Sequence, residues 1–241
     1  MTRVLVSAGL VIAAGLGLWA TYAAGGALML PHAPQPGTFG HAVLLFVMWW
    51  AMMLAMMLPS AAPAILSFAA ITRKQSGQSV WLLPVFTAGY VLIWTLFSVA
   101  ATGVQILTTE VAPLTGMMAL TSTALGGALL IAAGLYQFTP LKNACLRNCQ
   151  PPFMYLARHW RRGFAGALRM GLSHGLYCLG CCWVLMLLLF YGGVMELTWI
   201  VGLALYVAIE KFLPARFRVN DITGIALLLW GGWVLSRTLM T

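Results

Sequence analysis

Long apolar stretches, separated by short polar connections, follow one another along the whole of this 241-residue chain. A helix that crosses a bilayer needs about 17 to 25 mostly apolar residues, since it rises ~1.5 Å per residue through a ~30 Å hydrocarbon layer. The pattern predicts an all-α membrane protein, a single bundle of about seven transmembrane helices. The predicted spans are 4–24, 41–71, 80–107, 114–138, 165–190, 197–213 and 222–239.

The composition supports this interpretation. Hydrophobic residues make up 62% of the chain and charged residues only 7%, whereas about a quarter of the residues in an ordinary soluble domain are charged. The predicted environment is therefore the lipid bilayer. The net charge of +9 does not indicate nucleic-acid binding, because no folded soluble surface remains to present a basic patch. The first span could be a signal peptide, but its apolar run is long for one, which favours a retained helix.

The basic residues fix the predicted orientation. If the N-terminus is cytoplasmic and all seven spans cross, every Lys and Arg except Arg237 faces the cytoplasm, as the positive-inside rule requires. The C-terminus then lies outside, and the expected location is a bacterial inner membrane. The cytoplasmic set is Arg3, Arg73, Lys74, Lys142, Arg147, Arg158, Arg161, Arg162, Arg169, Lys211, Arg216 and Arg218.

The fifth predicted span carries an unusual row of ligand-forming side chains. His174, Cys178 and Cys182 follow one another at intervals of four residues, and Cys181 lies beside them, so all four share one broad side of a helix. Thiolate, thioether and imidazole ligands together select Cu(I), and less uniquely zinc. An ionisable residue within a span indicates a functional site. The alternative is that these cysteines are small buried hydrophobic residues.

The second predicted span is rich in methionine. Pro59 and Pro63 should kink or interrupt its helix and free backbone carbonyls. Methionine is a common apolar filler, so a packing surface competes with a thioether path for a metal. The methionines are Met48, Met52, Met53, Met56 and Met57.

Further candidates extend these two groups. Met170 and Met186 lengthen the row on the fifth span, and the predicted order of ligands from outside inward ends with His174, then Cys145 and Cys149. The nearby cations Lys142 and Arg147 favour metal binding or redox reactivity of that last pair. Contact between the second and fifth spans is a hypothesis.

Two charged residues close the sixth span. Glu210, beside Lys211, is expected in a structural ion pair at the membrane interface, with Lys142 or Arg169 as its partner.

Four segments resemble the signatures of a bacterial family described as predicted metal-binding integral membrane proteins, domain of unknown function 2182. They are Trp-Trp-Ala-Met-Met-Leu-Ala-Met-Met-Leu-Pro-Ser-Ala-Ala-Pro (49–63), Thr139-Pro-Leu-Lys-Asn-Ala-Cys-Leu-Arg-Asn-Cys149, Gly171-Leu-Ser-His-Gly-Leu-Tyr-Cys-Leu-Gly-Cys-Cys-Trp-Val-Leu-Met186 and Glu210-Lys-Phe-Leu-Pro214. The family includes membrane copper chaperones for tyrosinase-type polyphenol oxidases. The resemblance therefore implies copper handling by the methionines at 52, 53, 56 and 57 and by His174, Cys178, Cys181 and Cys182.

The sequence thus predicts a non-enzymatic inner-membrane protein that binds Cu(I) and delivers or translocates it for a partner cuproenzyme. Nothing in it resembles an ATP-binding segment, so a copper-pumping ATPase is excluded. Two other classes remain open: a non-catalytic accessory subunit of a larger membrane complex, and a membrane thiol oxidoreductase that uses the cysteines. Zinc and haem are the less favoured metals or cofactors.

Overall fold

The computed structural model describes residues 2–74, 81–111, 122–150, 152–213 and 217–239, and every regular element in these ranges is a helix. The predicted all-α class is confirmed. The helices are α1 (Thr2–Leu28), α2 (Phe39–Lys74), α3 (Leu82–Val111), α4 (Thr123–Gln137), α5 (Pro140–Cys149), α6 (Pro152–Arg158), α7 (Gly163–Leu187), α8 (Leu189–Gly192), α9 (Leu197–Phe212) and α10 (Val219–Leu239).

Five of the described helices are long and apolar enough to cross a membrane: α1, α2, α3, α10, and α7 with its short continuation α8. A sixth span results if α4 and α5, which meet at a bend of 65°, are taken as one. The helix α9 has only 16 residues, which is short for a transmembrane helix. Residues 80 and 114–121, which belong to two predicted spans, lie outside the described residues.

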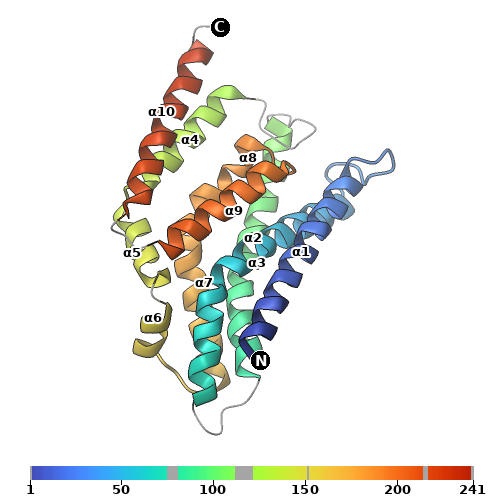
Figure 1. The fold of residues 1–241 in the computed structure, drawn as a ribbon. Helices are drawn as coiled ribbons and strands as arrows, with labels where there is room; N and C mark the ends of the chain where they lie inside the picture. Colours follow the sequence, from blue (N-terminus) through green and yellow to red (C-terminus); the bar gives the residue numbers. More distant parts are fainter. Residues whose placement is uncertain (1, 75–80, 112–121, 151, 214–216, 240–241) are drawn as a thin grey trace.

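The helices lie in pairs: α1 along α2, α3 along α7, and α4 along α10. The pair of α4 and α10 stands somewhat apart from the rest (Figure 1). Glycines make these contacts close. A Cβ on Gly171 of α7 would collide with the backbone carbonyl of Phe86 in α3, and one on Gly17 of α1 would lie 2.8 Å from the carbonyl oxygen of Ala51. Small residues at crossing points let helix backbones approach each other where lipid supplies no hydrophobic force between helices.

The bend between α4 and α5 has a local cause. Thr139 caps α5, since its Oγ1 accepts a hydrogen bond from the backbone N–H of Lys142 at 3.3 Å. Pro140 follows at the first helical position, where its missing N–H costs no hydrogen bond. The chain therefore starts a new helix in a new direction, and this helix packs against α7.

The helix α2 continues without interruption through Pro59 and Pro63, so the two prolines do not end it. The carbonyl oxygen of Met57, one turn before Ala61, accepts hydrogen bonds from two hydroxyl groups. Tyr90 of α3 donates at 3.0 Å and Ser60 at 2.9 Å. This part of α2 is thus tied by its backbone to α3.

Candidate metal centre

The three cysteines of α7 form the middle of a buried cluster. Cys178, Cys181 and Cys182 each expose 1% or less of their surface. The thiols of Cys181 and Cys182 both donate to the carbonyl oxygen of Cys178 at 3.0 Å. Because these bonds reach back three and four residues along the helix, the thiols gather within a single turn.

A lysine from another helix contacts this turn. The ammonium of Lys211, near the end of α9, donates a 2.9 Å hydrogen bond to Sγ of Cys178 and another of 2.9 Å to Oγ of Ser60 in α2. Lys211 is itself buried. A positive charge at this point favours a thiolate on Cys178, and the thiolate is the form that binds metals. Sequence reasoning missed this contact, although a lysine within an apolar helix is a signal of function.

Tyr90 of α3 completes the connection between α2 and α7. Its hydroxyl group lies 3.1 Å from Sγ of Cys178 and donates to the carbonyl oxygen of Met57. The thioether sulfur of Met57 is in turn 4.0 Å from Oγ of Ser60. The second and fifth predicted spans are therefore joined at Met57 and Cys178 through Tyr90 and Lys211.

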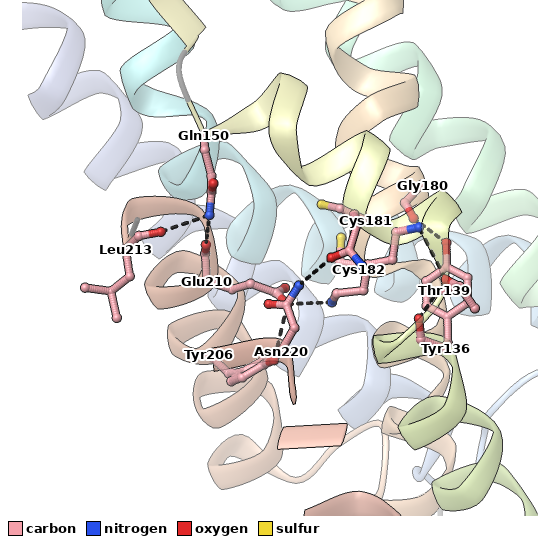
Figure 2. Close-up of polar contacts among 12 residues, drawn as sticks. Tyr136, Thr139, Gln150, Gly180, Cys181, Cys182, Tyr206, Glu210, Leu213 and Asn220 are labelled. Atoms are coloured by element: carbon pink, nitrogen blue, oxygen red, sulfur yellow. Dashed lines mark hydrogen bonds and ion pairs between the residues drawn. The ribbon is translucent and has the colours of Figure 1, made fainter. Parts of the chain in front are cut away.

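The two cysteines of α5 also reach the cluster. A Cβ on Gly180 would lie 2.5 Å from Sγ of Cys145, so Cys145 rests against α7 at that residue. Cys149 lies close enough to Cys181 for the two side chains to interact. The predicted order, in which these two cysteines follow His174 toward the inner end, differs from the structure because α5 bends back onto α7. All five cysteines are free and buried, and Figure 2 shows the adjacent Cys181 and Cys182.

His174 lies one turn before Cys178 and is 4% exposed. Its ring is 5.7 Å from that of Tyr90 and 6.3 Å from that of Phe86, measured between centroids. The side chain also lines a small pocket together with Cys149 and Lys211. The imidazole is thus placed between an aromatic wall and the ligand cluster.

The methionines predicted as ligands are all buried, but they do not all lie at the thiols. Met48, Met52, Met53, Met56 and Met57 expose 3% or less, and Met57 is joined to Cys178 through Ser60 and Lys211. Met48 instead lies near Met195, since a Cβ on Gly25 would meet the sulfur atoms of both. Met195 was not among the predicted residues. Met170 and Met186 are buried on α7.

The predicted acidic residue has a partner on α5. Glu210 pairs with Lys142 at 2.6 Å, and both side chains are completely buried. Tyr206 donates to the same carboxylate at 3.3 Å. The neighbouring Lys211 turns the other way, toward Cys178. The amide nitrogen of Gln150 donates to the carbonyl oxygens of Glu210 and Leu213, at 3.0 and 2.9 Å, and so ties the end of α5 to the end of α9 (Figure 2).

The described residues contain no group of three or more His, Cys, Asp and Glu side chains already arranged around a metal position. What they contain is a set of soft donors from three helices: thiols from α5 and α7, a thioether from α2 and an imidazole from α7. This donor set fits Cu(I) better than hard cations such as Mg²⁺ or Ca²⁺. Binding a metal at this centre would require the thiols of Cys181 and Cys182 to leave the carbonyl oxygen of Cys178.

Comparison with known families gives one match. The model of the family PpoB2, described as a copper chaperone, matches residues 46–234. The chain belongs to this copper chaperone family. The match includes the methionines of α2, all five cysteines, His174 and Lys211. A search of curated proteins and one of solved structures gave no match.

Proposed function

We propose that this member of the copper chaperone family is an inner-membrane protein that holds Cu(I) at the thiol cluster and delivers it to a partner cuproenzyme. The observation that carries the proposal is that Cys149, Cys178 and Cys181 gather inside an apolar bundle, with Met57 joined to Cys178 through Ser60 and Lys211. Soft sulfur ligands in a dry site suit Cu(I), and a transfer protein needs ligands that a partner can replace one at a time.

The proposed ligands are His174, Cys178, Cys181, Cys182 and Met57, with Cys149 in contact. The helix α2 contributes a proposed path for the ion, formed by Met52, Met53 and Met56. Secondary ligand positions are proposed at Met48, Met170 and Met186. Cys145 is the second thiol that α5 contributes. In this proposal copper is the ion that the protein carries, and the protein's side chains bind it and hold it in place.

The proposed topology has seven spans with a cytoplasmic N-terminus, α9 being a short seventh span. In this orientation α6 lies at the cytoplasmic side, together with most of the basic residues. Lys142 and Lys211, which the sequence also assigned to that side, are instead buried in the bundle. The topology is tested by labelling with a membrane-impermeant maleimide. Single cysteines are placed at Phe39 and at Phe153, both of which are exposed. Labelling of position 39 from outside and of position 153 only after lysis is expected, and the reverse pattern would contradict the topology.

The test of copper binding is anaerobic metal analysis of the purified protein beside the triple variant Cys178→Ser/Cys181→Ser/Cys182→Ser. About one or more copper atoms per chain, lost in the triple variant, are expected. A wild-type protein that stays free of metal after loading with Cu(I) would overturn the proposal and favour a role as accessory subunit. The triple variant Ser67→Ala/Ser98→Ala/Ser173→Ala controls for the number of substitutions.

A thiol oxidoreductase is less well supported. Such an enzyme needs thiols that the disulfide of a protein substrate can reach, whereas all five cysteines are buried. Replacement of Met57 by Leu should weaken copper binding but would leave disulfide exchange unchanged, so the two functions are separable by one variant.

A further inference from the structure

A small pocket leads from the edge of the bundle to the thiol cluster. Its volume is about 80 Å³, and its lining includes Ser60, Cys149, His174 and Lys211, with Gln150 and Phe212 among the outer residues. Phe212 is 58% exposed, while Cys149, His174 and Lys211 are each less than 9% exposed. The pocket therefore has an accessible rim and a floor of ligand-forming side chains.

Cys149 is the one cysteine that lines this pocket. The same thiol interacts with Cys181 on α7, and Cys181 shares the carbonyl oxygen of Cys178 with Cys182. Cys149 thus stands between the pocket and the other thiols. A metal ion entering through the pocket meets this sulfur before it meets the three cysteines of α7.

The charge of the pocket is positive. Lys211 contributes its ammonium group to the lining, and the nearest acidic residue, Glu210, is already paired with Lys142 at 2.6 Å. The remaining polar groups of the floor, Ser60 and His174, carry no negative charge. Inside a bundle of low dielectric constant this ammonium group attracts anions. A Cu(I) ion held by two thiolates is a monoanion.

The pocket is also small. A volume of about 80 Å³ accepts the sulfur and first carbon atoms of a thiolate together with the ion, but not a loop of a folded protein. The size therefore selects a carrier that can insert a single thin side arm.

We propose that this pocket is the port at which Cu(I) carried by a low-molecular-weight thiol passes to Cys149, and from there to Cys181. The inference rests on the proposed copper function and adds the carrier and the first ligand. In the exchange, the bond from copper to one carrier sulfur breaks and a bond to Sγ of Cys149 forms. The proton of the Cys149 thiol goes to the departing thiolate, and copper remains Cu(I), so no oxidant or reductant is needed.

The experiment measures how fast the full-length protein in detergent takes up Cu(I) from a Cu(I)–glutathione complex under anaerobic conditions. The amount of copper bound at equilibrium is determined first. Uptake by Cys149→Ser is expected to be at least tenfold slower than in the wild type. Phe212→Trp, which narrows the rim, should slow uptake severalfold, while Phe153→Trp, on the equally exposed α6 side chain, should leave it unchanged.

Each result decides one question. If copper binds at equilibrium but the wild type, Cys149→Ser and Phe212→Trp take it up at equal rates, the proposed port is contradicted. The proposed copper function is unaffected by that result. No copper in the wild type would overturn both. If Cys149→Ser misfolds, the wild-type protein still gives an answer: a small methanethiosulfonate should label Cys149 before the cysteines of α7, and Phe212→Trp should slow that labelling. A copper-loaded protein domain that outpaces Cu(I)–glutathione would also contradict the proposal.

Discussion

The Nζ atom of Lys211 lies 2.9 Å from the Sγ atom of Cys178, although the two residues belong to different helices and are 33 positions apart in the sequence. The contact brings a positive charge to the centre of a cluster of sulfur atoms. A site that holds a metal through several thiolates carries excess negative charge, and a buried cation compensates it. Lys211 is therefore expected to matter for binding although it cannot itself be a ligand while charged.

Replacement of Lys211 by Met keeps most of the volume and removes the charge. Because a hydrogen bond to a charged group contributes about 1.5–3 kcal/mol, we expect Cu(I) to bind at least about tenfold more weakly, which corresponds to ~1.4 kcal/mol. A competition titration against bicinchoninate measures the affinity. Arg169→Met on the exposed side of α7 is the control and should not change it; equal affinity in both variants would contradict a role for the charge.

The buried pair of Lys142 and Glu210 should be sensitive to removal of one partner. Glu210→Gln leaves Lys142 charged and unpaired, which costs about 3–5 kcal/mol in comparable buried pairs. Thermal unfolding in detergent, followed by circular dichroism, measures the loss. Restoring much of the stability with the double replacement Lys142→Met/Glu210→Met would confirm that the unpaired charge is the cause.

The control for this pair is at the surface. Arg218 and Asp221 are 2.8 Å apart, with side-chain exposures of 79% and 38%. Asp221→Asn should change stability by less than about 1 kcal/mol, because exposed ion pairs contribute little. A loss as large as that of Glu210→Gln would show that burial is not what distinguishes the two pairs.

Contact between α3 and α7 depends on Gly171. Adding a methyl group there forces it against the carbonyl of Phe86, and overpacking of this kind costs about 1–3 kcal/mol. Gly171→Ala should therefore lower the unfolding temperature. Gly103→Ala, on α3 with nothing within 4 Å of the new Cβ, should leave it unchanged or raise it, since Ala is the better helix former.

Tyr90→Phe removes the hydroxyl group that joins Met57 to Cys178. Loss of one buried hydrogen bond to the backbone should cost about 1 kcal/mol of stability. If this hydroxyl also orients the thiol, the alkylation rate of Cys178 in a variant with no other cysteine should change as well. A change in stability with an unaltered rate would limit Tyr90 to a structural role.

Sequence periodicity was enough to predict the helical class and the two helices that carry most of the candidate ligands. Spacing along one helix places Cys178 beside Cys182 without further information, because helical geometry is local. It could not place Lys211 or Tyr90 at Cys178, since lateral contacts depend on how the helices are ordered around each other. Cys149 is a related case: its helical spacing from Cys145 was visible, but the 65° bend that carries α5 to α7 was not.

The bounds of α9 were predictable from hydropathy, since the predicted span 197–213 and the helix Leu197–Phe212 differ by one residue. Hydropathy could not predict what lies at its end. The amide of Gln150, from a distant part of the chain, donates to the carbonyl oxygen of Leu213 directly after the helix.

The two bonds from Gln150 to α9 have a mechanical consequence. Cys149 directly precedes Gln150, which donates both bonds, and Lys211 directly follows Glu210, which accepts one of them. The two bonds therefore hold Cys149 and Lys211 in one rigid unit. Among the described residues, a single hydrogen bond, from Lys211 to Ser60, joins this unit to α2, whose Pro63 and Ala64 form the facing wall. Any widening of the pocket is therefore expected of α2, and a crosslink between α2 and α9 is expected to stop the proposed exchange of copper while leaving every proposed ligand in place.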